Sequence, residues 1–296
     1  MTERPPGRPG EAPVYLVTSA DQPELGADDQ LLHRELTAAG VPSQIAIWTD
    51  PEVDWAAASV CVLRSVWDYH LEPARFHSWL YQLEPVATVL NPPALVRWNA
   101  HKGYLRKLAA AGVPTIETAW LGHGEPADLT EVMRARGWNA AIVKPAVSAS
   151  AWKTAKVELG DPEGQHLVDD LIGHTDVMVQ PWLDTIERDG EVAVIAIGGE
   201  VTHAAGRASA LTGGIESTRH GWPHRLCPDE HALASFVLSL LPTTPLYARV
   251  DLVRDEHGRL LLGELELIEP VLYLHHSRPA LERLVAALAP GGTTRA

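Results

Sequence analysis

The hydrophobic positions along the chain alternate between short apolar runs and longer segments with helical spacing. Apolar runs occur at residues 14–19, 43–48, 59–65 and 86–91. The segments 28–40 and 72–84 between them repeat apolar residues every three or four positions, which is typical of amphipathic helices. Strands that alternate with helices predict an opening βαβ-type domain, with boundaries at residues 14–98.

The pattern continues beyond the two prolines at positions 92 and 93. We expect helices at 100–112, 129–137, 164–173, 228–241 and 278–289. We expect strands at 115–121, 140–146, 151–159 and 176–183. A hairpin is expected at 191–207, with Gly198 and Gly199 at its turn, and a second at 247–267. The chain is therefore predicted to be an α/β protein.

The second hairpin carries an unusual group of carboxylates. Glu264 and Glu266 are two positions apart, so on a strand they share one face. Adjacent like charges raise at least one pKa or require a cation between them. A turn at residues 254–258 would bring Asp251 beside this pair. The three carboxylates could bind a hard divalent cation such as Mg²⁺; the alternative is an ordinary solvated sheet face.

Composition excludes several classes of protein. The 38 acidic residues outnumber the 24 basic ones, giving a net charge of −14, which argues against non-specific binding to nucleic acid or to an anionic membrane. Cys61 and Cys227 lie far apart, so neither a disulfide framework nor a cysteine zinc site is indicated. No apolar run approaches the ~20 residues of a membrane span. We expect a cytoplasmic monomer or homodimer that acts on a small molecule.

No standard phosphate-binding motif occurs, but two lysines lie at informative positions. Lys102 opens the expected helix 100–112, and Lys144 lies near the end of the strand 140–146. An ammonium is costly to desolvate without a partner, so Lys144 suggests a ligand, although it could also extend to the surface. The loop at 145–154 is rich in small and hydroxyl residues. Such a loop can bind phosphates through its N–H groups or can be an ordinary connection.

The order of the motifs resembles the ATP-grasp superfamily. They are "HKGYLRKLAAAGVPT", "VKPA", "VQPWLDTIERDGEVAVIAIGGE", "ARVD" and "GELELIEP". The resemblance covers about residues 95–275 and is to the glutathione-synthetase-like and ribosomal-modification-ligase-like branch. "RSVWDYH" and "NPPALVRWNAHKGYL" are similar to a narrower group that includes D-cycloserine synthetase. The resemblance implies an ATP-grasp fold, with a small lobe at 99–183 and a large lobe with the metal site at 184–296, which clasp ATP.

The resemblance also implies the roles of particular residues. ATP and two Mg²⁺ ions would be the cofactors. The implied ATP-binding residues are Lys102 and Lys144 at the phosphates, Ser148 and Ser150 on the covering loop, Gln180, Trp182 and Leu183 at the adenine, and Glu191 and Glu187 at the ribose. The implied metal ligands are Asp251, Glu264 and Glu266. Arg207 or Arg249 would neutralise the transferring phosphoryl group.

This sequence departs from the family pattern in two places. Related glutathione synthetases commonly have Asn where Glu266 stands, and an oxygen ligand is kept here. Family members often have several glycines where this chain reads "VSASAW".

The segment "RSVWDYH" follows the expected strand 59–65, and ligands of open α/β sheets gather beyond the carboxyl ends of strands. Arg64 could pair with a substrate carboxylate and Asp68 with an ammonium. Trp67 and Tyr69 could line the pocket, or could be core aromatic residues. Such a set suits a small amino acid. The loop 211–222 has the glycine pair and polar content of a mobile lid.

The resemblance implies an ATP-dependent carboxylate–amine ligase that acts through an acyl phosphate. The particular reaction expected is cyclisation of O-ureido-D-serine to D-cycloserine, with release of ADP and phosphate. The alternatives are an intermolecular amino-acid or peptide ligase of the same superfamily and a non-catalytic nucleotide-binding protein. The complete set of Asp251, Glu264, Glu266 and Arg207 favours the enzyme.

Overall fold

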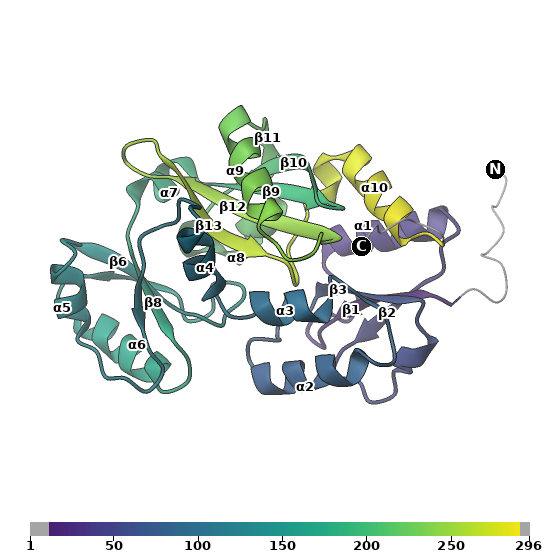
Figure 1. Cartoon of the computed structure of the whole chain (residues 1–296), viewed down its shortest axis with the longest axis horizontal. Coiled ribbons are helices and arrows are strands. Elements are labelled where there is room, and N and C mark those ends of the chain that lie inside the picture. The colour runs from purple at the N-terminus through teal and green to yellow at the C-terminus, as the bar shows by residue number, and fades with distance from the viewer. Residues whose placement is uncertain (1–11, 291–296) are drawn as a thin grey trace.

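The computed structural model describes residues 12–290, except for the side chains of Thr212, Ile215, Glu216 and Ser217. Three sheets lie along the long axis of the molecule (Figure 1). The N-terminal sheet is at one end, a small antiparallel sheet is at the other, and a larger antiparallel sheet lies between them. The predicted α/β class is confirmed.

The N-terminal sheet is parallel and has the strand order β2-β1-β3-β4. Its strands are β1 (Val14–Thr18), β2 (Ser43–Ile47), β3 (Val60–Ser65) and β4 (Val89–Leu90). Its helical segments are α1 (Ala27–Ala38), η1 (Trp55–Ala57), α2 (Pro73–Leu83) and α3 (Pro93–Asn99). Successive residues of β1 point to opposite faces, so that Leu16 packs in one core with α1 and Val17 in another with α2. Helices therefore cover both faces, as parallel sheets require.

The small sheet has the order β5-β8-β6-β7, and all its pairs are antiparallel. Its strands are β5 (Ala119–Leu121), β6 (Ala140–Pro145), β7 (Ala155–Glu158) and β8 (Val177–Pro181). Helices α5 (Leu129–Arg134) and α6 (Pro162–Ile172) pack on one face through the buried Ala141 and Val143 of β6. Ile142 and Lys144 alternate with these residues, so they point to the opposite face, where a pocket lies.

The large sheet has the order β11-β10-β9-β12-β13. Its strands are β9 (Glu191–Ile197), β10 (Glu200–Arg207), β11 (Trp222–His224), β12 (Tyr247–Arg254) and β13 (Leu260–Glu266). The remaining helical segments are α4 (Tyr104–Ala110), α7 (Asp184–Asp189), α8 (Ala210–His220), α9 (Pro228–Ser239), η2 (Leu274–His276) and α10 (Arg278–Leu288). Strand β9 is apolar on both faces because α10 packs on one and α9 on the other.

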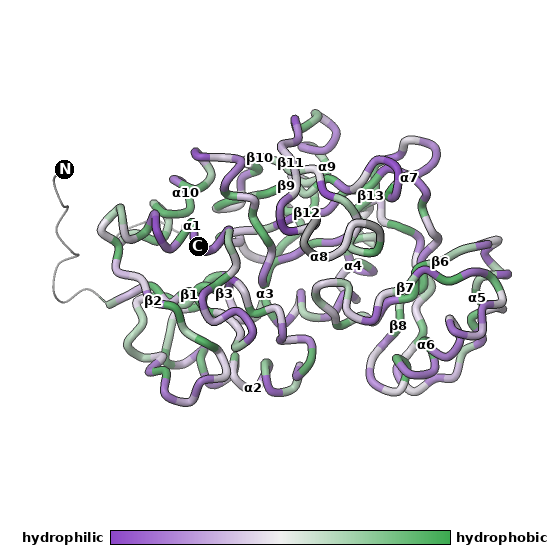
Figure 2. The backbone as a smooth tube through the Cα atoms, turned by 180° about the vertical axis from the view of Figure 1, so that it is seen from behind, coloured by the Kyte–Doolittle hydropathy of each residue, from purple (hydrophilic) through white to green (hydrophobic). Residues whose placement is uncertain are grey.

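Hydrophobic positions run through the strands of the sheets (Figure 2). One buried cluster joins α1 and the N-terminal sheet to β9 and α10 of the large sheet, so these two parts share a core. No helix within residues 12–290 has the length and apolar character needed to cross a membrane.

Four local expectations were wrong or incomplete. The helix expected at 100–112 begins only at Tyr104, and Lys102 lies in the turn before it. The strand expected at 151–159 is reduced to β7, because residues 151–154 form a turn. The segment 211–222, expected to be a lid loop, is mostly the helix α8, which is kinked at Gly214. Helices α3 and α7 were not predicted from the pattern.

Candidate active site

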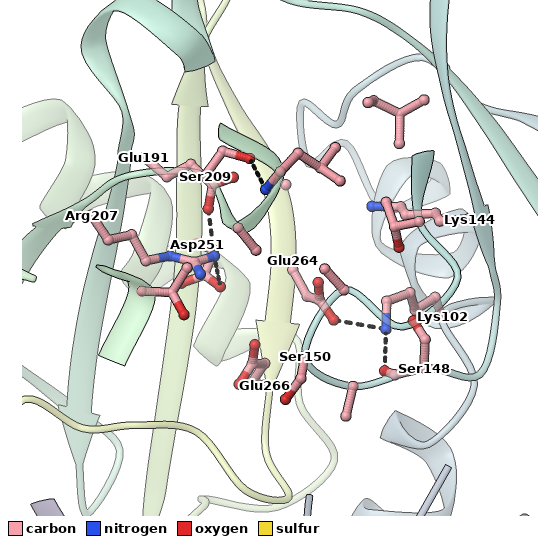
Figure 3. A pocket seen from close by; sticks show the side chains of 18 of the residues that line it. Lys102, Lys144, Ser148, Ser150, Glu191, Arg207, Ser209, Asp251, Glu264 and Glu266 are labelled. Carbon is pink, nitrogen blue, oxygen red and sulfur yellow. Dashed lines mark hydrogen bonds and ion pairs between the residues drawn. The ribbon is translucent and has the colours of Figure 1, made fainter. Parts of the chain in front are cut away.

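One pocket collects residues from the two antiparallel sheets, from the segment that follows β3 and from the segments between these parts. The N-terminal part contributes Trp67 and Tyr69, the small sheet contributes Lys144 and Gln180, and the large sheet contributes the carboxylate hairpin. Lys102 and Lys144 lie on one side of Glu264, and Arg207 and Asp251 lie on the other (Figure 3). Segments far apart in the sequence therefore bring opposite charges into one cavity.

The hairpin formed by β12 and β13 places the acidic residues as their spacing predicts. Asp251 lies directly opposite Glu264, and Arg249 lies opposite Glu266. Because side chains alternate along a strand, all four point to the same face, which lines the pocket. The register shifts just beyond Asp251, next to Gly263. The structure thus brings Asp251, Glu264 and Glu266 together.

Lys102 links the turn before α4 to both the hairpin and the loop after β6. Its Nζ lies 2.9 Å from Glu264 Oε1 and donates to the carbonyl of Ser148 at 2.9 Å. Its backbone N–H donates to the carbonyl of Ala146 at 2.8 Å. Burial would raise the pKa of Glu264, but Lys102 and Lys144 outweigh it and hold the pKa below its usual value. Glu264 is therefore ionised in the pocket.

Lys144 projects from β6 into the same space. Within residues 12–290, no hydrogen bond or ion pair involves its ammonium, and the residue is half-buried. Burial lowers its pKa, although the nearby Glu264 carboxylate opposes this effect. A cation in this position is available to an anionic ligand, as the sequence position suggested.

The two arginines bracket Asp251. Arg249 donates to both of its carboxylate oxygens, at 2.9 and 3.0 Å, and also to Glu266. Arg207 lies 2.8 Å from the same carboxylate and also pairs with Glu191. The pKa of Glu266 is raised to about 7, chiefly by burial. Arg249 lowers this pKa, whereas repulsion from Asp251 and Glu264 raises it. Glu266 therefore holds its proton more tightly than an ordinary carboxyl group, and a bound cation would favour its charged form.

The balance of charges in the pocket indicates whether a metal ion would fit there. Its basic residues are Lys102, Lys144, Arg207, Arg219 and Arg249. Its acidic residues are Glu191, Asp251, Glu264, Glu266 and Glu269. A polyphosphate would add negative charge to this balanced set, so further cations would be needed. The second carboxylate oxygens of Glu264 and Glu266 accept no hydrogen bond from the described part of the chain. Such oxygen donors suit Mg²⁺.

The loop between β6 and β7 covers one side of the pocket. Ser148 is buried, and Ser150 lines the cavity with the neighbouring small residues. Ser150, Ala151 and Lys153 have positive φ angles of 52°, 54° and 49°. Non-glycine residues seldom adopt this region, so the loop is held in an unusual turn. Ser148 and Ser150 therefore lie where the sequence placed them, at the cavity wall.

The candidate adenine site lies at the end of β8. Gln180, Trp182 and Leu183 all line the pocket, and Gln180 donates to the Thr118 hydroxyl at 2.9 Å. Glu191 lines it as well. Glu187 does not: it lies on the exposed side of α7 and is absent from the cavity wall. The helix α7, which the sequence analysis missed, turns this residue outward, so Glu187 is not placed to bind a ribose.

The substrate residues expected from "RSVWDYH" divide into two groups. Trp67 and Tyr69 line the pocket. Arg64 is fully buried elsewhere, where it lies 2.7 Å from Asp29 and donates to the carbonyl of Pro270 at 2.7 Å. The chain itself supplies the carboxylate that the sequence analysis assigned to a substrate. Arg64 is therefore a structural residue.

Asp68 is also directed away from the cavity. Its carboxylate accepts a hydrogen bond of 2.7 Å from the indole of Trp48, and it does not line the pocket. The expectation that Asp68 binds a substrate ammonium was therefore misplaced, because the chain turns between Trp67 and Tyr69.

The structure adds pocket residues that the sequence analysis did not assign. Asn99 lines the pocket and holds the edge of β13 by accepting from the N–H of Leu267 and donating to the carbonyl of Leu265, both at 2.8 Å. Arg219 of α8 lies with its guanidinium carbon 4.4 Å from the ring centre of Trp67. Glu269, the third acid of "GELELIEP", also lines the pocket. Because Glu269 lies beyond the end of the expected strand, alternation along that strand did not predict the direction of its side chain.

A second group of possible metal ligands lies at the start of α9. Donor atoms of His224, Cys227 and Glu230 are within 4.8 Å of one another. Glu230 is already engaged, because it accepts from the backbone N–H of Cys227 and from His224, both at 2.9 Å. This arrangement is a capping box that satisfies the helix terminus.

Comparison with known proteins agrees with this geometry. Residues 14–91 match the family model described as the N-terminal domain of D-cycloserine synthetase DcsG. The chain is 29% identical to the cycloserine biosynthesis protein DcsG of Streptomyces lavendulae over 295 residues, covering 93% of this chain and 97% of that protein. It superposes on the crystal structure of D-cycloserine synthetase DcsG with a TM-score of 0.84 and 28% identity, covering 93% and 98% of the two chains.

A more distant likeness identifies the wider fold. The ATP-grasp ligase PsnB, in a complex with minimal precursor, Mg and ADP, superposes with a TM-score of 0.60 and 17% identity, covering 94% of this chain and 99% of PsnB. The chain thus has the ATP-grasp fold. Its similarity to D-cycloserine synthetase over 93% of its length identifies it as an ATP-dependent ligase. Within that class it resembles D-cycloserine synthetase, as the motifs of its N-terminal part indicated.

Proposed function

We propose that the enzyme uses ATP to activate the carboxylate of a small amino acid and then closes a ring within the same molecule. The substrate proposed is O-ureido-D-serine and the product D-cycloserine. The observation that carries the proposal is the convergence of Lys102, Lys144, Arg207 and Arg249 with the carboxylate hairpin in one pocket. Similarity to D-cycloserine synthetase over nearly the whole chain supports the choice of substrate.

Each residue has a defined task in this proposal. The adenine lies against Gln180, Trp182 and Leu183, and the ribose is held by Glu191 alone. The ammonium groups of Lys102 and Lys144 bind the phosphates, and the N–H groups beside Ser148 and Ser150 close over them. Asp251, Glu264 and Glu266 would hold Mg²⁺. When bound, two such ions neutralise the phosphate oxygens and so permit approach of a second anion.

The proposed reaction has three steps: phosphoryl transfer, acyl transfer with ring closure, and hydrolysis. A carboxylate oxygen attacks the γ-phosphorus and ADP leaves, with Arg207 or Arg249 stabilising the negative charge of the transferring group. The ureido nitrogen that is bonded to oxygen then attacks the acyl carbon. Phosphate leaves, the nitrogen loses its proton and the ring forms. Water removes the carbamoyl group as carbon dioxide and ammonia, which leaves D-cycloserine.

The test is incubation of the purified protein with ATP, Mg²⁺ and O-ureido-D-serine, with ADP and D-cycloserine measured by liquid chromatography and mass spectrometry. We expect both products in equal amounts, and neither when ATP or the acid is omitted. If ADP forms without D-cycloserine, and an added second amine becomes joined to the acid, the reaction is intermolecular ligation and not cyclisation. The proposal would be contradicted if O-ureido-D-serine released no more ADP than the protein releases in the absence of substrate.

A further inference from the structure

Glu269 is a buried pocket acid whose carboxylate has no partner among the described residues. It follows β13, lines the cavity and is only 8% exposed. Its backbone carbonyl accepts a hydrogen bond from the indole N–H of Trp67 at 3.1 Å. Within residues 12–290, however, its carboxylate takes part in no hydrogen bond or ion pair. The other four pocket acids all have cationic partners, namely Glu191, Asp251, Glu264 and Glu266.

The surroundings of Glu269 make this lack of a partner costly. Burial raises its pKa well above the usual range, and repulsion from Glu266 adds to the shift. Tyr69 also lines the pocket, where burial raises the pKa of its hydroxyl and the Glu269 carboxylate raises it further. A buried carboxylate without a counter-charge is strongly disfavoured unless it is protonated. Where such a group lines a ligand pocket, a ligand is the natural source of the missing charge.

The two basic residues that lower the pKa of Glu269, Lys102 and Arg249, are already committed to other carboxylates. Lys102 is bound to Glu264 and to the Ser148 carbonyl. Arg249 is bound to Asp251 and Glu266. A small cation that enters the pocket can therefore meet the Glu269 carboxylate without first breaking an ion pair of the enzyme.

We propose that Glu269 binds the protonated amine of the substrate, and that the enzyme therefore selects small carboxylic acids that carry such an amine. This inference rests on the proposed ligase function and deepens it. It replaces Asp68, whose carboxylate is bonded to Trp48 and lies off the cavity wall. In this proposal Glu269 binds the amine end of the substrate and so orients the substrate's own carboxylate toward the phosphates of ATP.

The experiment compares O-ureido-D-serine with 3-(ureidooxy)propanoic acid, which is the same acid without the amine. Calorimetry in the presence of Mg²⁺ and AMPPNP measures binding, and ADP release measures turnover. We expect the wild type to prefer the amine-bearing acid by about 10- to 100-fold, the range for one charge-assisted pair. Glu269→Gln should reduce that preference to within about 3-fold, leaving AMPPNP affinity unchanged.

Two further variants separate recognition from folding. Glu269→Asp keeps the charge and should retain most of the preference. Glu52→Gln, on an exposed residue outside the cavity wall, should behave as wild type. Since the Glu269 carboxylate has no partner within residues 12–290, its Gln variant should melt at or above the wild-type temperature. A melt lowered to the same extent in the Gln and Asp variants, with the preference unchanged, would make the residue structural and overturn the inference.

The remaining outcomes are distinct. Equal binding of the two acids by the wild type, or an unaltered preference in Glu269→Gln, would overturn the inference while leaving the ligase intact. Loss of preference in Asp68→Asn alone would also overturn it. If the wild type turns over neither acid, the proposed reaction is wrong. A panel of α-amino acids and their deaminated counterparts then decides the inference, and equal acceptance of the deaminated acids overturns it.

Discussion

The ammonium of Lys102 lies 2.9 Å from the carboxylate of Glu264, and this contact joins the proposed phosphate site to the proposed metal site. Both residues are nearly enclosed by the pocket, with side-chain exposures of 8% and 27%. In the proposed function, phosphates that bind Lys102 take the counter-charge from Glu264, which then becomes available to a cation. The ion pair keeps both groups ionised in the ligand-free protein, as this proposed exchange of partners requires.

Replacing Glu264 with Gln should therefore abolish turnover but not folding. Gln keeps the shape of the side chain and removes the charge that a metal requires. Outer-sphere changes at metal sites cost 10- to 100-fold, so loss of a direct ligand should lower kcat by at least about 100-fold. Phosphate release at saturating Mg²⁺ measures the effect, with Glu52→Gln as the matched exposed control. Wild-type turnover in Glu264→Gln would remove Glu264 from the metal site.

Lys144→Ala should weaken nucleotide binding. The Lys144 ammonium projects into the pocket without a partner among the described residues, so its removal costs the apo protein little and the complex one charge-assisted contact. We expect AMPPNP affinity to fall by about 2 kcal/mol. Calorimetry of Lys144→Ala beside Lys107→Ala, an exposed lysine of α4, tests this. Equal affinities in the two variants would exclude Lys144 from the phosphate site.

Arg64→Ala should unfold the protein at lower denaturant concentration. Its guanidinium is fully buried, is bound to Asp29 and lies 4.7 Å from the ring centre of Tyr247. Removing it leaves the Asp29 carboxylate buried and unpaired, which costs about 3–5 kcal/mol in unfolding free energy. Urea titration gives the value. A wild-type midpoint combined with a raised KM for the amino acid would instead restore the substrate role expected from the sequence.

We expect the free energy of unfolding to fall in mild acid because of His70. Burial lowers its pKa to about 4 from an ordinary value of 6.5, and Lys102 also disfavours its charged form. Below pH 6.5 the unfolded chain takes up a proton that the folded chain refuses, so stability falls as pH drops from 6.5 to about 4. The loss attributable to His70 is about 2–3 kcal/mol.

The measurement is urea unfolding between pH 8 and pH 4. His70→Gln should flatten the pH dependence across that window, because glutamine does not titrate. His166→Gln, which alters an exposed residue of α6, is the control. If both variants keep the wild-type slope, another group is responsible for the acid sensitivity.

The sequence predicted those parts of the site that depend on local periodicity. Alternation along residues 247–267 placed Asp251, Glu264 and Glu266 on one face, and β12 and β13 confirm this pairing. Lys144 was similarly placed by its strand. These predictions succeed because a strand fixes the direction of each side chain relative to its neighbours.

The wrong and the missing assignments concern placements that local pattern does not determine. Arg64 meets Asp29, 35 positions away on another element, so no inspection of "RSVWDYH" could show that its charge was already paired. Glu187 is turned outward by the short helix α7, which lacks a clear apolar repeat. Glu269 lies beyond the end of β13, where alternation no longer indicates a face. Tertiary packing settles all three.

If ATP phosphorylates the substrate carboxylate, as proposed, an oxygen atom of that carboxylate must leave with the phosphate. The protein is given ATP, Mg²⁺ and O-ureido-D-serine labelled with ¹⁸O in both carboxylate oxygens, and the released phosphate is analysed by mass spectrometry. Attack of the ureido nitrogen on an acyl phosphate expels phosphate with one oxygen from the acid. The account predicts one ¹⁸O atom in each phosphate released during turnover. Unlabelled phosphate alongside D-cycloserine would contradict it.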